Sequence, residues 1–372
     1  MNIVSGTRRV RAVMTGLVLL CSGIVFAQED DPKIKGKPVS KWIEQLRGKN
    51  RGLQVRAARA LSAAPTNLHS RIAPQVIPVL KSERENDKFV AAQILGEYGP
   101  AARAAIPDLL PMLKGTQYER NRAAAAKALG QILKDAKPDK EVDTVTAALI
   151  EVFTDQYDDV RREAVTACGM IGPAAKACIP HLTPRLNEQI GYPPKPVAVA
   201  AAWTCERMGP LAKEHVDLLI GLMHRVMGYT PAYISALGGI GPVHKNVVPN
   251  LMDNMEQYTS WHLESWQVLQ KFSTKAEEVI PFAKRFLANA TFYGANNGPH
   301  RELVVIEAMK FLQVAGPKAV DALPEVERLI HYKHEFDKRP LMKKEAAKTA
   351  GILKGLAGGS AKKAAPGDKE GE

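Results

Sequence analysis

The segment Asp158-Asp-Val-Arg-Arg-Glu-Ala-Val-Thr-Ala-Cys-Gly-Met-Ile-Gly-Pro173 decides the fold of this chain of 372 residues. An alanine-containing run with helical spacing is followed directly by a Gly-Pro pair. Glycine tolerates the left-handed conformation that ends a helix, and proline cannot continue the helix. The pair occurs five times along the chain, at Gly99-Pro100, Gly172-Pro173, Gly209-Pro210, Gly241-Pro242 and Gly316-Pro317. The sequence therefore predicts a series of helix pairs.

A second proline follows four of these pairs after seven residues, at Pro107, Pro180, Pro249 and Pro324, and Asp217 stands there in the fifth case. Such a proline suits the first turn of the next helix. We define an anchor as the residue four positions before each of these glycines. The same local context, a run of small residues that ends on an apolar residue, also occurs elsewhere in the chain. Together these positions give nine anchors: Leu61, Leu95, Leu129, Cys168, Cys205, Leu237, Leu269, Leu312 and Ala350. The anchors are 32 to 43 residues apart. A period in this range is typical of stacked repeats, so nine helical hairpins are expected.

The expected second helices read alike, for example Phe89-Val-Ala-Ala-Gln-Ile-Leu-Gly96 and Arg122-Ala-Ala-Ala-Ala-Lys-Ala-Leu-Gly130. The run Asp158 to Ala164, with Gly169 to Gly172 after it, resembles the HEAT repeats, and most of all the HEAT-like repeats of the phycobilisome-lyase type in a secreted bacterial form. The resemblance covers residues 37–356. It implies an all-α superhelix, a HEAT/armadillo-like α-solenoid, and a function in scaffolds, adaptors or a few enzymes. Aromatic residues make up only 6% of the chain and no sustained period-two run occurs, which excludes a strand-based fold.

The N-terminus has the pattern of a secretory signal peptide over residues 1–27. Arg8, Arg9 and Arg11 precede an apolar run, and Val25-Phe26-Ala27 predicts cleavage after Ala27. A lipoprotein signal at Cys21 is the alternative, but Leu20 is too bulky for the position before a lipidated cysteine. No later stretch is long and apolar enough to span a membrane. Residues 28–36 are expected to be a linker, with Trp42, Ile43 and Leu46 turned inward on the first helix, and residues 357–372 a disordered tail.

Basic residues gather at the two ends of the chain. Removal of residues 1–27 lowers the formal net charge from +12 to +9, with Lys33, Lys35, Lys37, Lys41, Lys49 and Arg51 as the densest group. Such a surface can recruit polyanions or acidic cell surfaces, or it can simply be a set of solvated helix faces. No nucleic-acid motif accompanies the group, so nucleic acid is not the expected partner.

The sequence carries no pattern for catalysis, a metal or a cofactor. The single His334-Glu335 pair and the scattered histidines do not provide a metal-ligand set, and no nucleophile elbow or P-loop occurs. Cys168, Cys178 and Cys205 remain after signal removal. We expect them to be buried small apolar residues, and a Cys168–Cys178 bridge is the alternative pairing.

Tyrosines gather where the two helices of a repeat should turn. Exposed tyrosine and tryptophan beside polar residues are typical of contact surfaces, although each tyrosine could instead pack across its own turn. The turn from Asn289 to Pro299 is the longest within a repeat and is the first site candidate. The candidate partner-binding residues are Tyr118, Tyr157, Tyr192, Tyr229, Tyr258, Trp261, Tyr293, Asn296 and His300.

These features predict a secreted or periplasmic scaffold without catalysis, which binds an unknown protein partner by its turn edge or its concave face. The alternative is a module that binds polyanions or cell surfaces with its basic N-terminal repeats and tail. Salt separates the two hypotheses, because affinity for a polyanion falls steeply as the salt concentration rises.

Overall fold

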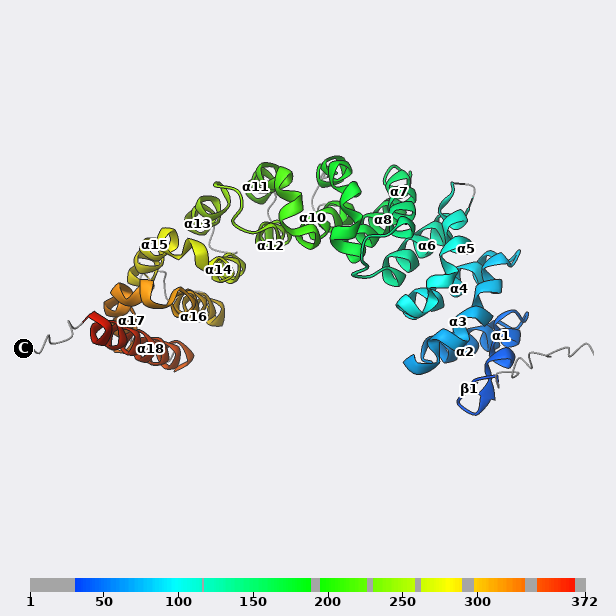
Figure 1. Ribbon diagram of the computed structural model, residues 1–372, viewed down its shortest axis with the longest axis horizontal. Helices are drawn as coiled ribbons and strands as arrows, with labels where there is room; N and C mark the ends of the chain where they lie inside the picture. The colour runs from blue at the N-terminus through cyan, green and yellow to red at the C-terminus, as the bar shows by residue number, and fades with distance from the viewer. Residues whose placement is uncertain are drawn as a thin grey trace, which may run out of the picture.

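The chain folds as an arch of stacked helical hairpins in a computed structural model. The structure describes residues 31–115, 117–188, 195–225, 230–257, 262–289, 298–331 and 340–364. Within these ranges the elements form nine hairpins, as the repeat period predicts, and the fold is all-α apart from one short β-hairpin. The second helices line the concave side, which is clearest for α12, α14, α16 and α18 in Figure 1.

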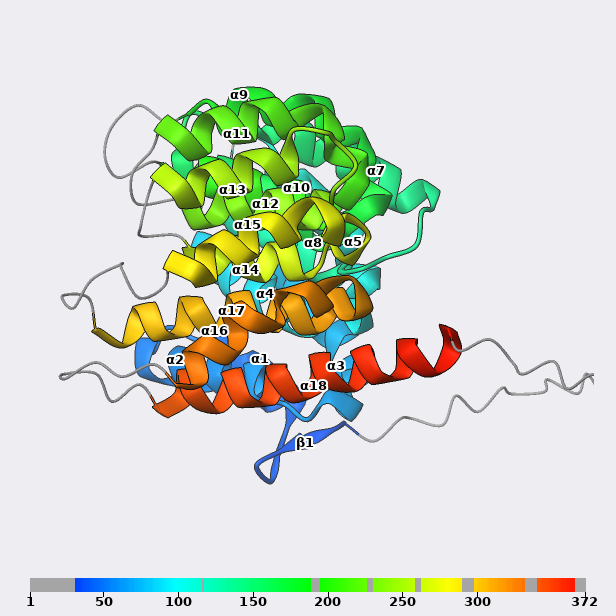
Figure 2. The ribbon, with the colours of Figure 1, turned by 90° about the vertical axis from the view of Figure 1, so that its left-hand side faces the viewer.

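The first helix of each hairpin is often interrupted by 3-10 turns. The α-helical parts on this outer side are α1 (Val39–Leu46), α3 (His69–Val76), α5 (Ile106–Leu109), α7 (Lys140–Val152), α9 (Leu182–Leu186), α11 (Val216–Arg225), α13 (Val247–Gln257), α15 (Ala276–Asn289) and α17 (Leu323–Ile330). Their 3-10 partners are η1 (Thr66–Leu68), η2 (Ile77–Lys81), η3 (Gly99–Ala105), η4 (Leu110–Leu113), η5 (Gly172–His181), η6 (Gly209–His215), η7 (Ser273–Lys275) and η8 (Gly316–Ala322). The outer helices α11, α13 and α15 lie nearly parallel in the stack (Figure 2).

The second helices are continuous, and in most hairpins they are longer than the α-helical part of the first helix. They are α2 (Arg51–Ser62), α4 (Glu85–Glu97), α6 (Glu119–Ile132), α8 (Asp158–Ile171), α10 (Pro196–Met208), α12 (Thr230–Ile240), α14 (His262–Gln270), α16 (Gly298–Ala315) and α18 (Pro340–Ala364). Each carries one of the nine predicted anchors, and every anchor is buried. The anchors therefore mark the line along which the repeats share one continuous core.

The Gly-Pro pairs act as predicted from the sequence. All five glycines have a positive φ, between 56° at Gly99 and 86° at Gly241, a conformation that costs glycine little. The later prolines fit less uniformly. Pro107 and Pro324 lie in the first turn of α5 and α17, whereas Pro180 lies inside η5, before α9 begins. The difference arises because η5 is the longest 3-10 helix among the described residues. It continues to His181, so α9 begins only after Pro180.

Glycines directly after several anchors set the distance between neighbouring second helices. A Cβ atom added to Gly130 would lie 2.5 Å from Cα of Ala167, and one added to Gly169 would lie 2.5 Å from the Trp203 ring. Real Cβ atoms do not approach other atoms so closely, so α6, α8 and α10 pack at a spacing that a larger residue would disturb.

The two ends of the arch differ from the expected boundaries. The predicted linker 28–36 includes part of a hairpin of β1 (Lys33–Ile34) and β2 (Lys37–Pro38), in which Ile34 is buried and accepts a hydrogen bond of 3.0 Å from the Trp42 indole. This hairpin covers the open end of the core. At the other end α18 extends to Ala364, into the predicted tail, because extending a helix that is already anchored adds hydrogen bonds without a new nucleus.

The three cysteines are free and buried, as expected for small apolar residues, and the Cys168–Cys178 bridge is not formed. A contact with Cys178 and burial raise the pKa of the Cys168 thiol, and burial raises that of Cys205. Within the described ranges, no helix combines the length and the apolar character that crossing a membrane requires.

Candidate functional site

Tyr118 and Tyr157 occupy the same place in consecutive repeats, at the N-cap of α6 and α8. Neither side chain caps its helix, and the side chains are exposed by 61% and 44%. Because they are not needed to close the helix, both phenol rings are available on the turn edge. Tyr157 is partly held by Arg122 of the preceding repeat, whose guanidinium carbon lies 5.6 Å from the ring centre.

A buried arginine network lies beneath these tyrosines and joins one repeat to the next. Arg122 donates two hydrogen bonds to Asp155, at 2.7 and 2.9 Å, and a third to the carbonyl of Gln117. Arg161 repeats the pattern with Glu188 at 2.8 Å and the carbonyl of Asp155 at 2.6 Å. Bidentate contacts of this kind fix geometry as well as charge. The turn edge is thus a rigid support between residues 117 and 188.

Charge pairing in this network changes the titration of Asp155. Partial burial opposes ionisation, but the hydrogen bonds from Arg122 and from the amide of Tyr157 outweigh it, so the pKa lies below its usual value. Asp155 is therefore ionised at neutral pH. Sequence reasoning missed this network, although the recurrence of Arg122 and Arg161 near the start of consecutive helices could have indicated it.

The other predicted edge residues cannot be placed in the same way. Tyr192, Tyr229, Tyr258, Trp261, Tyr293 and Asn296 lie outside the described residues, as does most of the candidate turn from Asn289 to Pro299. His300 belongs to α16, but its side chain is outside the described part. Of the predicted residues, only the side chains of Tyr118 and Tyr157 can therefore be placed, at equivalent positions of consecutive repeats.

A second candidate surface lies at the N-terminal end of the arch and consists of two adjoining hollows of ≈ 600 and ≈ 360 Å³. Both are lined by Val55 and Arg59 of α2, so they form one surface, which we call the basic groove. Eight basic residues line it against the single acidic residue Asp87: Lys35, Lys37, Lys49, Arg51, Arg56, Arg59, Arg84 and Arg120. Four of them belong to the basic group expected from the sequence.

The expected basic group is divided by the fold. Lys41 lies on the exposed face of α1 and pairs with Glu44 at 2.8 Å, outside the groove. Arg84 and Arg120 come from later repeats and join the groove only because the repeats stack. Arg84 is fixed there by Asp87 at 2.7 Å and by the carbonyl of Gly48 at 2.9 Å.

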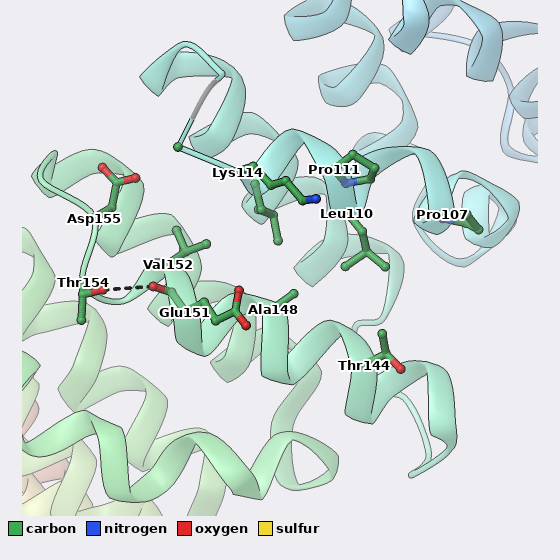
Figure 3. A pocket seen from close by; sticks show the side chains of 12 residues that line it. Pro107, Leu110, Pro111, Lys114, Thr144, Ala148, Glu151, Val152, Thr154 and Asp155 are labelled. Atoms are coloured by element: carbon green, nitrogen blue, oxygen red, sulfur yellow. Dashed lines mark hydrogen bonds between the residues drawn. The ribbon is translucent and has the colours of Figure 1, made fainter.

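A third hollow, of ≈ 750 Å³, opens on the outer side between η4 and α7 (Figure 3). Apolar side chains such as Leu110, Ala148 and Val152 cover much of it, with Lys114 and Glu151 among the polar residues. No arrangement of nucleophile and base accompanies it. Among the described residues, no group of three or more histidine, cysteine or acidic side chains is placed to hold a metal ion.

Comparison with known proteins supports the repeat assignment. Residues 73–169 match the family model described as HEAT repeats, which confirms the resemblance over that part of the chain. No curated protein matches the chain significantly.

Solved structures show the same fold at low identity. One is the karyopherin Kap121p bound to the extreme C-terminus of the protein phosphatase Cdc14p, with a TM-score of 0.57 and 14% identity over 84% of this chain and 39% of that chain. Another is Kap95p bound to RanGDP, with a TM-score of 0.58 and 12% identity over 85% and 46%. The CpcE–CpcF complex of phycocyanin lyase from Nostoc sp. PCC7120 gives a TM-score of 0.41 and 18% identity over 78% and 98%. The chain spans less than half the length of the karyopherins it matches.

Proposed function

We propose that this α-solenoid with HEAT repeats is a scaffold that binds a protein partner and has no catalysis of its own. The observation that carries the proposal is the pair of exposed tyrosines, Tyr118 and Tyr157, repeated at one place of consecutive hairpins. Tyrosine offers a large rigid face and a polar tip, which suits a protein contact.

Two further points support this proposal. The arginine network beneath the tyrosines holds the repeats in register, so a partner that contacts both would lose little conformational entropy in the scaffold. The related fold in Kap121p is described in complex with a segment of another protein, which shows that such an arch can hold a protein chain.

Site-specific photo-crosslinking tests the turn edge. We expect a benzoylphenylalanine placed at position 118 or 157 to crosslink one and the same partner in envelope extracts, at low and at high salt. Aromatic contacts depend little on salt, unlike contacts of exposed charges. The readout is mass spectrometry of the crosslinked species.

A matched control uses the same probe at Leu211, which is also exposed but lies in η6, away from the tyrosines. The Tyr118→Ala/Tyr157→Ala double variant should lose most of the partner in affinity capture. Equal crosslinking from position 211, or capture that the double variant leaves unchanged, would remove the turn edge from the proposal.

We also propose that the mature scaffold is secreted or periplasmic and begins at Gln28. The arginine-flanked apolar segment before Ala27 supports this location. Mass spectrometry of the protein purified from its own cells should give a mature N-terminus at Gln28. An uncleaved N-terminus would contradict the location, and a lipid-modified chain that begins at Cys21 would favour membrane anchoring instead.

A second candidate function, binding of a polyanion or cell surface, is favoured by the basic groove. Its eight basic side chains give it a strongly positive character. Capture of a polyanion that is abolished by salt and unaffected by the tyrosine substitutions would favour this function over the scaffold.

A further inference from the structure

The basic groove gathers positively charged side chains, several of which have no acidic partner among the described residues. Elsewhere several basic residues reach acids of the next repeat, as Arg103 reaches Glu141 at 2.6 Å and Lys284 reaches Asp321 at 3.0 Å. Five groove residues have no acidic partner within the described part of the chain, and all five are exposed: Lys35, Lys49, Arg51, Arg56 and Arg59. Their charges are available to a ligand.

Arg51 begins α2, and this start differs from those of the next three second helices. Acidic residues occupy the first turn of α4, α6 and α8, where they complement the positive end of the helix. Helix α2 has no acid there and begins with Arg51. A cation at a helix N-terminus is electrostatically unfavourable, and a bound carboxylate beside Arg51 would reduce this cost.

The packing of the first two repeats leaves room for a ligand. Gly96, Gly130 and Gly169 follow their anchors and allow close approach of the next helix. Between α2 and α4, by contrast, the larger hollow opens, lined by Val55 of α2 and Val90 of α4. The groove is therefore an opening in the stack and not only a charged face.

The floor of the groove is apolar. Val55 lines both hollows and is 45% exposed, and Ala58 and Val90 lie beside it in the larger one. In the smaller hollow the Lys37 ammonium lies 4.1 Å from the centre of the Trp42 ring. An exposed apolar strip between unpaired cations suits a ligand with both carboxylates and aliphatic side chains.

We propose that the basic groove binds an acidic, partly apolar peptide segment of the partner protein, with Arg51 and Arg59 holding its carboxylates and Val55 contacting its aliphatic side chains. This inference rests on the proposed scaffold function and adds the chemistry of the partner. Nucleic acids and sulfated polysaccharides have no aliphatic side chains for the Val55 strip, so they use only part of the surface.

Fluorescence anisotropy with synthetic probes tests the proposal on the chain that begins at residue 28. The probe is a labelled peptide of about 12 residues, long enough to cross both hollows, in which glutamates alternate with leucine and glycine. We expect it to bind at least about fivefold more tightly than a matched peptide with serine for leucine, because leucine burial adds to the charge contacts. The Arg51→Glu/Arg59→Glu variant should weaken binding roughly tenfold.

Two controls distinguish an effect of net charge from an effect of the groove residues. Lys134 and Lys137 are exposed and lie outside the groove, so Lys134→Glu/Lys137→Glu changes the net charge equally and should leave the affinity within about twofold. The Val55→Asp variant should abolish the preference for the leucine peptide. Circular dichroism of each variant checks that the fold is retained.

The opposite results overturn the inference. Equal affinity for the leucine and serine peptides, equal losses in the two double variants, or tighter binding of a heparin fragment or a single-stranded oligonucleotide would each show a general polyanion surface. If the leucine peptide fails to bind while positions 118 and 157 still crosslink a partner, the groove inference fails and the scaffold function stands. If the peptide binds as expected but nothing crosslinks, the turn edge fails instead.

Discussion

Replacement of Trp266 by alanine is expected to reduce the stability of the C-terminal repeats by about 3–5 kcal/mol. Trp266 is fully buried on α14. Its ring lies 5.6 Å from that of Phe282, 5.4 Å from Phe286 and 5.8 Å from Phe311, so one side chain joins α14, α15 and α16. The truncation removes these contacts and leaves a cavity that the surrounding helices fill only in part.

Hydrogen exchange is the measurement suited to this change, because repeats of a solenoid interact mainly with their neighbours and can open locally. Exchange should accelerate in α14 and α16 and stay unchanged in α4 and α6, which serve as an internal reference. The Leu211→Ala variant, at an exposed position, should change stability by less than about 0.5 kcal/mol. Uniform acceleration along the chain would contradict a local aromatic core.

Replacement of Arg122 by alanine is expected to cost about 3–5 kcal/mol, because it leaves Asp155 buried and without its partner. The Arg122 and Asp155 side chains are only 5% and 10% exposed, at an ion-pair distance of 2.7 Å. The Lys81→Ala variant removes an exposed pair with Asp108 and should cost less than about 1 kcal/mol. A similar loss in both variants would show that burial of the Arg122 pair is unimportant.

The loss of stability in the Arg122→Ala variant should also depend on pH. The folded-state pKa of Asp155 lies below the unfolded value of 3.8, so its contribution is complete above that value and is lost as pH falls through the folded pKa. Urea unfolding at neutral pH should therefore show the full difference between wild type and Arg122→Ala, and the difference should shrink below about pH 4. A constant difference down to strongly acidic pH would contradict the role of the Asp155 charge.

Several local features of this chain could be predicted correctly without coordinates. The Gly-Pro pairs end helices because the conformations of glycine and proline depend on the backbone of a few residues. The nine anchors are buried because apolar spacing along one helix already selects its inner face. The free, buried cysteines follow from the same spacing.

The expected boundaries at the two ends were less accurate. The segment before α1 has linker-like composition. Ile34 is nevertheless buried, because the Trp42 indole, eight residues later, donates a hydrogen bond to its carbonyl. The helical part of α18 extends past residue 356 because an existing helix supports added turns that composition alone does not predict.

The candidate surfaces were likewise predictable from the sequence only in part. Tyr118 and Tyr157 could be aligned by counting from their anchors, because equivalent positions of a repeat lie along one edge. The arginine network beneath them could not be predicted in this way, because Arg122 and its partner Asp155 are distant in sequence. The same holds for the basic groove, where Arg59 and Arg84 of different repeats line one hollow.

The sequence by itself determined the hairpins, their junctions and the buried line of anchors, since each depends on conformational preferences and apolar spacing within about one repeat. Only the tertiary structure decided which cations remain unpaired and where the stack opens between α2 and α4. The physical reason is that charge pairing and close packing depend on the distance between neighbouring repeats. That distance is set by the side chains where the helices meet, such as Gly130 against Ala167.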